Sequence, residues 1–135
     1  MKATDLMIGD WVGRVFDDKR IDYRQVDWIR TGEIGMRYQK VWAIGCIEPI
    51  PLTAEILEKD GWERDIDKEW EYNNSHILPH YCYQWEKQNV KIEMYAGLEG
   101  FTISLIIGRR FYAVHELQHV LRLYGLDELA DNFKV

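Results

Sequence analysis

The stretch HYCYQWEKQNVKIEM, residues 80–94, decides the fold that the sequence predicts. In its first half Tyr81, Tyr83 and Trp85 alternate with other residues, and in its second half the apolar residues at 90, 92 and 94 do the same. A period of two places such residues on one face of a β-strand, and the polar segment 87–89 can form a turn. We expect an antiparallel hairpin with its aromatic face in the core; an aromatic surface for partner contact is the alternative.

The same hairpin is expected to extend into a meander on its C-terminal side. Glycines at 97–100 and 108–110 indicate turns on either side of apolar segments at 101–105 and 111–113. Upstream, Thr53 can cap a short helix over residues 54–59, and Gly61 can end it in the left-handed conformation. The sequence therefore predicts a linker helix followed by a meander of three or four antiparallel strands.

Residues 1–50 have the pattern of a small all-β module. Apolar segments at 6–8, 11–16, 23–29, 35–38 and 41–47 are separated by glycine or polar residues. Their start, Ile8-Gly9-Asp10-Trp11-Val12, looks like the opening strand of SH3-like barrels, a likeness of fold with little functional weight. Pro49 and Pro51 then favour an extended connector.

The C-terminal segment is predicted to be helical from Val114 to Tyr124 and to stop at Gly125, with a further helical turn within 127–133. The expected fold class is therefore α+β: a small N-terminal β-barrel-like module, a linker helix, and an antiparallel β-meander closed by a C-terminal helix. We expect two parts, residues 1–50 and 51–135, with one continuous domain as the alternative.

Composition narrows the class of protein. The chain has 135 residues and a formal charge of −6, and its first residues carry charge where a secretory leader or membrane anchor would be apolar. Cys46 and Cys82 lie far apart and form no Cys-x-x-Cys pair, so we expect two partly buried free thiols in a reducing compartment. These features predict a cytoplasmic protein with no membrane partner.

Acidic residues are concentrated in the middle of the sequence. Residues 53–75 hold three basic and eight acidic side chains, and residues 63–71 are expected to form a solvated loop. Binding to a phosphate backbone depends on clustered Lys and Arg, so this balance argues against nucleic acid as a partner. A nucleic-acid-binding barrel remains a third hypothesis, through Arg14, Lys19, Arg20 and Arg24.

One motif raises a catalytic alternative. His115 and His119 are four residues apart, so they share one helix face, and both imidazoles could bind one zinc ion while Glu116 acts as general base. Residues 112–119 thus resemble the active-site helix of zinc metallopeptidases. In this alternative zinc is the cofactor, His115 and His119 are its ligands, and Glu116 is the catalytic residue.

Several features of the sequence argue against that alternative. A catalytic zinc needs a third ligand, and Glu128 or Asp131 could supply it only if the tail folded back. A four-histidine site with His76 and His80 would need a tertiary contact, because Pro79 prevents a helix there. The helical wheel also places both histidines of the motif on a solvent-facing side beside Arg122, whose charge opposes a metal ion. The sequence therefore favours no catalytic, cofactor or metal site.

Three segments together resemble a known family: DLMIGDWV at 5–12, IEPIPLTAEILEKDGW at 47–62 and YAVHELQHVLRLYGL at 112–126. They look like a family of short uncharacterised proteins from gut Bacteroides-type bacteria and their phages. The resemblance covers about a third of the chain and implies a phage or mobile-element origin. The leading hypothesis is therefore a non-enzymatic accessory or protein-interaction module, with a partner protein and an oligomeric state that the sequence does not specify.

Overall fold

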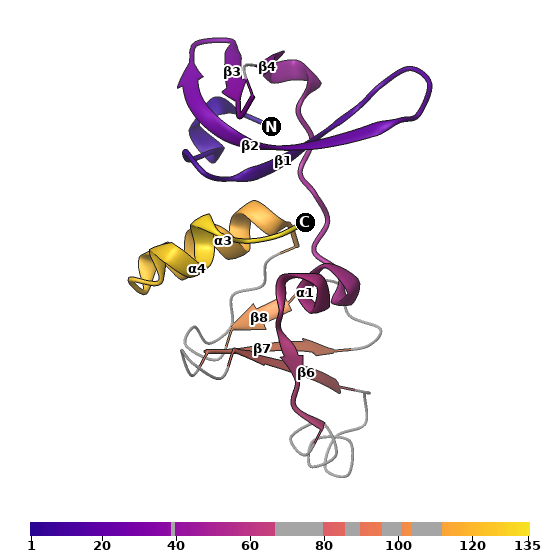
Figure 1. Cartoon of the computed structure of the whole chain (residues 1–135), viewed down its shortest axis with the longest axis vertical. Helices are drawn as coiled ribbons and strands as arrows, with labels where there is room; N and C mark the ends of the chain where they lie inside the picture. The colour runs from indigo at the N-terminus through magenta and orange to yellow at the C-terminus, as the bar shows by residue number, and fades with distance from the viewer. Residues whose placement is uncertain (39, 67–79, 86–89, 96–100, 104–111) are drawn as a thin grey trace. The chain divides into compact units, whose positions relative to one another are not determined.

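The computed structural model describes residues 1–38, 40–66, 80–85, 90–95, 101–103 and 112–135, with the backbone alone at 80–82 and in the last two strands (Figure 1). The fold is mixed α+β, as expected. Contacts divide the chain into two units: the first is Met1–Pro51 with Ala113–Phe133 and Val135, and the second is Leu52–Tyr112 with Lys134. The expected division near residue 50 put the C-terminal helix in the second part, whereas its contacts group it with the first. The second unit is thus an insertion within the first.

The first unit contains a four-stranded antiparallel sheet in the order β1-β2-β3-β4 (Figure 1). Its strands are β1 Trp11–Val15, β2 Ile21–Arg30, β3 Glu33–Met36 and β4 Lys40–Ala43. Each strand lies beside its neighbours in sequence, which makes the sheet an antiparallel meander, and among the described residues no closed barrel is found. One side of it covers a core cluster of apolar side chains: Leu6, Val12, Val26, Ile34, Met36, Trp42 and Ile47.

Two short helices lie beside or within segments that were expected to be strands. Ala3–Asp5 is a 3-10 helix (η1), and the predicted strand at 6–8 is wrong because the chain turns at Gly9 to enter β1. Ile44–Cys46 is a second 3-10 helix (η2), which ends β4 earlier than expected. The expectation for Cys46 is also wrong, since its thiol is free but exposed; the side chain of Cys82 lies outside the described residues.

The paired strands β1 and β2 form a two-stranded arm. β3 pairs only with residues 26–30 of β2, so Ile21–Gln25 pairs with β1 alone and extends beyond β3 (Figure 1). Along the arm, Val15 lies directly opposite Ile21, and Gly13 lies opposite Tyr23. Since facing residues of antiparallel strands point to the same side, Val15, Ile21 and Tyr23 share one face.

An irregularity in β2 between Val26 and Trp28 shifts the register and brings Trp28 opposite Gly35. The indole of Trp28 then lies on the glycine: a Cβ atom at residue 35 would stand 2.0 Å from the indole Cε2. Arg30 covers the same ring, with its guanidinium carbon 4.7 Å from the ring centroid. The absence of a side chain at Gly35 is what makes room for this stack.

The first unit also holds the two C-terminal helices, α3 Val114–Leu123 and α4 Asp127–Asp131, both close to the expected positions. α3 ends at Gly125, whose φ of +74° is left-handed, and the amide of Leu126 bonds back to the carbonyl of Leu121 at 2.9 Å. The apolar residues Leu117 and Leu121 are fully buried, whereas Leu123 is 75% exposed.

In the second unit, α1 Ala54–Asp60 begins and ends as predicted. The hydroxyl of Thr53 accepts a hydrogen bond from the amide of Ile56 at 3.2 Å, and Gly61 has φ +104°. The amide of Trp62 then bonds to the carbonyl of Leu57 at 3.0 Å, and both side chains are buried. The linker helix is therefore held at both ends by local hydrogen bonds that the sequence specifies.

The second unit's sheet has the order β5-β6-β7-β8, with strands β5 Glu63–Arg64, β6 His80–Trp85, β7 Val90–Tyr95 and β8 Phe101–Ile103. The hairpin of residues 80–94 is confirmed, with Tyr83 buried and Trp85 packed edge-on against Trp62 at 5.6 Å. Residues 63 and 64 form an exposed strand where a loop was expected. The expected turns at 87–89, 97–100 and 108–110 and most of the acidic loop lie outside the described residues.

No helix in the described ranges is long and apolar enough to cross a membrane.

Candidate functional site

A polar cluster in the first unit joins α3 to the turn before β1. Its centre is Asp10, whose side chain is fully buried. The carboxylate accepts hydrogen bonds from Nε2 of His119 at 2.6 Å, from Nη1 of Arg122 at 2.6 Å and from the amide of Met7 at 2.8 Å. A buried carboxylate is stabilised only by such partners, so the three donors offset the cost of burying Asp10.

Gln118 is the second link between α3 and the same turn. Its side-chain oxygen accepts a hydrogen bond from the amide of Trp11 at 2.9 Å, and its amide nitrogen donates to the carbonyls of Gly9 and Ala130 at 3.0 and 2.9 Å. All of these polar atoms are satisfied although Gln118 has no exposed surface. The side chain thus bonds the turn, α3 and α4 together.

Gln25 adds a third link, from β2. Its amide nitrogen donates to the carbonyl of Gly9 at 3.1 Å and to that of Asp131 at 3.0 Å. Asp131 in turn accepts from Nη2 of Arg122 at 3.1 Å. The C-terminal tail therefore does fold back onto α3, and it does so to pair with an arginine.

At Gly9 the turn comes close to a side chain of α3. It has φ +92°, and a Cβ atom there would stand 2.9 Å from Nη2 of Arg122. A residue with a side chain would meet both the backbone strain and the guanidinium. The glycine therefore allows the turn to lie against the arginine that holds Asp10.

The solvent-facing position expected for the two histidines of the motif is wrong. His115 is only 7% exposed, and the side chain of His119 is 23% exposed. Their rings meet edge-on, with centroids 5.6 Å apart. The helical wheel fails here because this side of α3 is covered by polar partners from the N-terminal turn, which lie more than a hundred residues away in sequence.

His115 carries a buried Nδ1 atom that has no hydrogen-bond partner in the part of the chain that the structure describes. Burial lowers the pKa of this imidazole below its usual 6.5, and the nearby charge of Asp10 acts in the opposite direction. An imidazole in such a position is favoured as the neutral form. We therefore expect acid to destabilise the polar cluster around His115.

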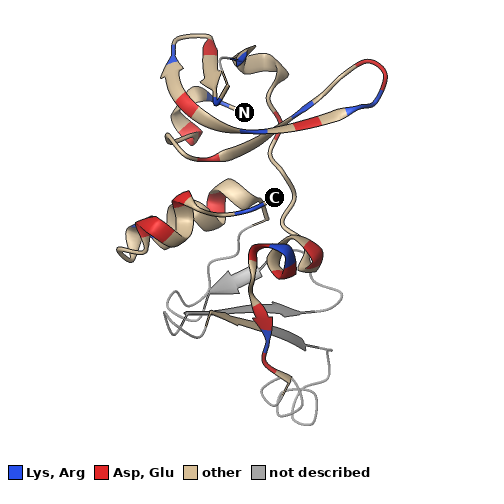
Figure 2. Cartoon of the chain, in the orientation of Figure 1, with Lys and Arg blue, Asp and Glu red and all other residues tan. Residues whose placement is uncertain are grey.

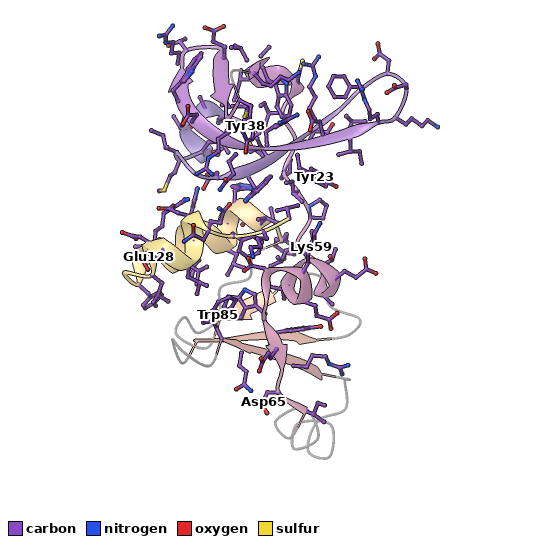
Figure 3. All side chains as sticks on the ribbon, in the orientation of Figure 1. Tyr23, Tyr38, Lys59, Asp65, Trp85 and Glu128 are labelled. Carbon is purple, nitrogen blue, oxygen red and sulfur yellow. The ribbon has the colours of Figure 1, made fainter. Side chains whose placement is uncertain are left out.

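Among the described residues, the two histidines of the motif have other surroundings than the expected zinc site would give them. Nε2 of His119 is engaged by Asp10, and the positive charge of Arg122 lies on the same carboxylate. In the described ranges no group of three His, Cys, Asp or Glu side chains is placed to hold a metal ion. Glu128 lies exposed on α4 (Figure 3), and His76 and the side chain of His80 lie outside the described residues.

The four basic residues singled out in the sequence all lie on the arm, where Asp17, Asp18 and Asp22 lie among them. Arg14 and Arg20 both stack on Phe16, with guanidinium carbons 4.6 and 4.5 Å from the ring centroid. Arg24 pairs with Asp22 at 3.2 Å, and Lys19 is exposed in the turn. Figure 2 shows acidic and basic residues interspersed along the arm. The acidic residues would repel a phosphate backbone, so this arrangement disfavours nucleic-acid binding.

The arm has a second face, on the side opposite Arg14 and Arg24, that is apolar and open to solvent. Val15, Ile21 and Tyr23 are 46%, 53% and 40% exposed, and the ring of Tyr23 lies within 3.4 Å of the Cβ position of Gly13. We call Val15, Ile21 and Tyr23 the arm face. Sequence patterning missed it because alternation alone does not tell which side of a strand is covered.

The second unit has a titratable group of its own. Asp60 is buried, accepting hydrogen bonds from the indole of Trp62 at 2.9 Å and from the amide of Lys134 at 2.7 Å. Burial raises the pKa of its carboxyl from 3.8 to about 6, although both hydrogen bonds and the charge of Lys134 act to lower it. Desolvation is thus the larger effect at this site.

Comparison with known proteins assigns no family and no function to these sites. No family model matches the chain, and neither a curated protein nor a solved structure is significantly similar to it.

Proposed function

We propose that this chain is a non-enzymatic protein-interaction module whose first unit binds a partner protein through the arm face. The observation that carries the proposal is the joint exposure of Val15, Ile21 and Tyr23 on one side of a two-stranded arm. Apolar side chains gathered on one exposed face are typical of surfaces that become buried in a complex.

The construction of the arm supports the same proposal. A two-stranded ribbon is marginally stable by itself in water, and its faces need packing partners. The base of the arm has them, because Trp11 and Gln25 are bonded to the C-terminal segment, with the indole of Trp11 donating to the carbonyl of Phe133 at 2.6 Å. Among the described residues of the first unit, none covers the outer part of the arm face in this way, and a partner would supply that cover.

The polar cluster supports a structural role for the conspicuous motif. His119 is hydrogen-bonded to Asp10, and Gln118 is hydrogen-bonded to Trp11 and Gly9. All three partners lie in or beside one turn. A side chain held in this way fixes the base of the arm rather than a substrate. The motif thus fits a binding module, in which a rigid scaffold presents an exposed surface.

Quantitative affinity purification from the native cells tests the proposal. The wild-type chain is compared with Ile21→Glu, which places a charge on the arm face, and with the matched control Thr31→Glu, which lies exposed in another turn. We expect one or more proteins to be lost with Ile21→Glu and retained with Thr31→Glu. Identical sets of bound proteins for all three chains would count against the arm face as a binding surface.

Three finer points belong to the same proposal. The curled N-terminal sheet with its one-sided core supports a description as SH3-like. An accessory role for a phage or mobile element rests on the sequence resemblance alone. A cytoplasmic location is supported by the free, exposed thiol of Cys46, which suits a reducing compartment.

A further inference from the structure

We propose that the arm pairs edge to edge with the arm of a second copy of this chain, in antiparallel order about a two-fold axis at Ile21. The proposal goes beyond the proposed function, because it concerns the backbone edge of the arm and not the side chains of the arm face. Three observations carry it: the open outer edge of β2, the point where β3 ends, and the order of charges along β2.

The outer edge of β2 is open along the arm. Gly13 exchanges two backbone hydrogen bonds with Glu48, at 2.9 and 2.8 Å, so its backbone groups point away from Tyr23, which lies opposite it. Hydrogen-bonded and non-hydrogen-bonded pairs alternate along antiparallel strands, so the amides and carbonyls of Tyr23 and Ile21 point to the outer edge of β2. In the part of the chain that the structure describes, none of these four groups has a hydrogen-bond partner. Such an edge is a template for an added strand.

The end of β3 limits where a second strand can lie. The amide of Arg37 donates to the carbonyl of Gln25 at 3.1 Å, so the outer edge of β2 is occupied from Gln25 onward. A two-fold axis at Tyr23 would set Ile21 of the second copy opposite Gln25, where the chain that follows β3 already lies. The axis must therefore be nearer the tip of the arm, at Asp22 or Ile21.

The charges along β2 decide between these two positions. An axis at Asp22 would set the two Asp22 carboxylates opposite each other, and it would set Arg20 opposite Arg24 of the second copy. Like charges in facing positions are destabilising. An axis at Ile21 instead sets each Asp22 opposite Arg20 of the other copy, which gives two pairs of opposite charge (Figure 2).

On the other side of the sheet, the same axis joins the two arm faces. The two Ile21 side chains would lie directly opposite each other, and each is 53% exposed in the single chain. Facing side chains of antiparallel strands point to the same side. Val15, Ile21 and Tyr23 of both copies would therefore form one continuous apolar surface, twice the size of a single arm face.

Sedimentation equilibrium of the full chain tests the proposal. We expect a monomer–dimer equilibrium that Ile21→Pro abolishes, because proline removes the outward amide of the central pair without breaking a bond to β1. Val15→Pro is the matched control, since it removes the outward amide directly opposite, on the other edge of the arm. Circular dichroism checks that both variants are folded.

Three results of this experiment would overturn the proposal. The first is a wild-type chain that stays monomeric up to about 1 mM. The second is a dimer that persists in folded Ile21→Pro, and the third is a dimer that Val15→Pro weakens equally. A monomeric chain that still binds its partner through the arm face would leave the proposed function intact, as would one that takes up a strand of another protein at this edge.

An exchange of charges tests the position of the axis. Asp22→Arg and Arg20→Asp each set like charges opposite each other and should weaken the dimer about tenfold or more, whereas the double variant restores opposite charges and should recover it. The exposed Asp27→Arg lies outside the paired residues and should leave the dimer unchanged. A double variant no stronger than the single ones would overturn the pairing about Ile21.

Discussion

The imidazole of His119 donates from Nε2 to the carboxylate of Asp10 at 2.6 Å, across 109 residues of sequence. This bond and the 2.6 Å contact of Arg122 with the same carboxylate attach α3 to the turn that opens β1. Residues that resemble a catalytic motif in the sequence therefore act, in the folded first unit, as the attachment point of the last helix.

Removing the carboxylate should weaken the first unit strongly. In Asp10→Ala, Arg122 and His119 lose their partner in a site with little access to water, and we expect a loss of about 3 kcal/mol in the free energy of unfolding. Urea denaturation measures it. The exposed Asp17→Ala on the arm should change stability by no more than about 0.5 kcal/mol. Equal effects of the two substitutions would contradict the role given to Asp10.

The buried imidazole of His115 should make stability fall in acid. Its pKa in the folded chain is lowered from 6.5 by burial, so the unfolded chain binds the proton more readily. The contribution of the neutral ring is fully present above about pH 6.5 and is lost as the pH falls below that value. Unfolding free energies measured between pH 7.5 and pH 5 should therefore decline less steeply in His115→Gln. Parallel curves for the two proteins would show that His115 does not titrate in this way.

Asp60 should change stability with pH in the opposite direction from His115. Its pKa is raised from 3.8 to about 6, so the folded chain binds the proton more readily, and the stability this contributes is present below 3.8 and lost as the pH rises through about 6. The indole N–H of Trp62 donates to this carboxylate and reports its charge. Its NMR shift should titrate with a midpoint near 6 in the wild type and not in Asp60→Asn. A midpoint near 4 would mean that the carboxyl is well solvated.

A methyl group at Gly35 should be costly because the indole of Trp28 occupies its place. We expect Gly35→Ala to destabilise the chain by about 1–3 kcal/mol, as is usual for overpacking. The loss should shrink when Trp28→Ala is combined with it. Gly45→Ala is the matched control, since nothing lies within 4 Å of its Cβ position. A Gly35→Ala protein as stable as the control would show that Trp28 moves aside freely.

Gly125 tests the end of α3. Its φ of +74° is unfavourable for a β-branched side chain, so Gly125→Val should cost roughly 1 kcal/mol or more, although open space surrounds the Cβ position. Thermal or urea denaturation of the variant measures the loss. Because no neighbour is displaced, the effect isolates backbone strain from packing. A wild-type midpoint would mean that the helix ends differently in solution.

Local structure was predictable where it depends on neighbours in sequence. Thr53 and Gly61 bound α1, and Gly125 ends α3, because each acts through backbone groups a few residues away. The alternation at residues 80–94 likewise specifies a hairpin, since paired strands there are joined by a short segment. In each case the deciding hydrogen bonds lie within one element or between adjacent ones.

The candidate sites were not predictable in the same way. In the sequence, Asp10 has the pattern of a turn residue. No neighbouring residue in the sequence indicates that its carboxylate will be buried against His119 and Arg122. The helical wheel of α3 also assumes that only the apolar side of the helix is buried, whereas the side that carries His115 and Gln118 is buried as well. Gln118 is buried by partners at both ends of the chain, which periodicity cannot reveal.

The long bond between Trp11 and Gln118 has a consequence for how the chain is made. The two residues are 107 positions apart, so at ~5–20 residues per second the ribosome needs on the order of ten seconds between them. During that interval the newborn N-terminal sheet has emerged without the helix that covers its turn, and Asp10 has neither of its side-chain donors. The whole inserted unit is synthesised in the meantime. Completion of the first unit therefore comes after the inserted unit has been synthesised, and a chain released before α3 would lack the side-chain partners of Asp10.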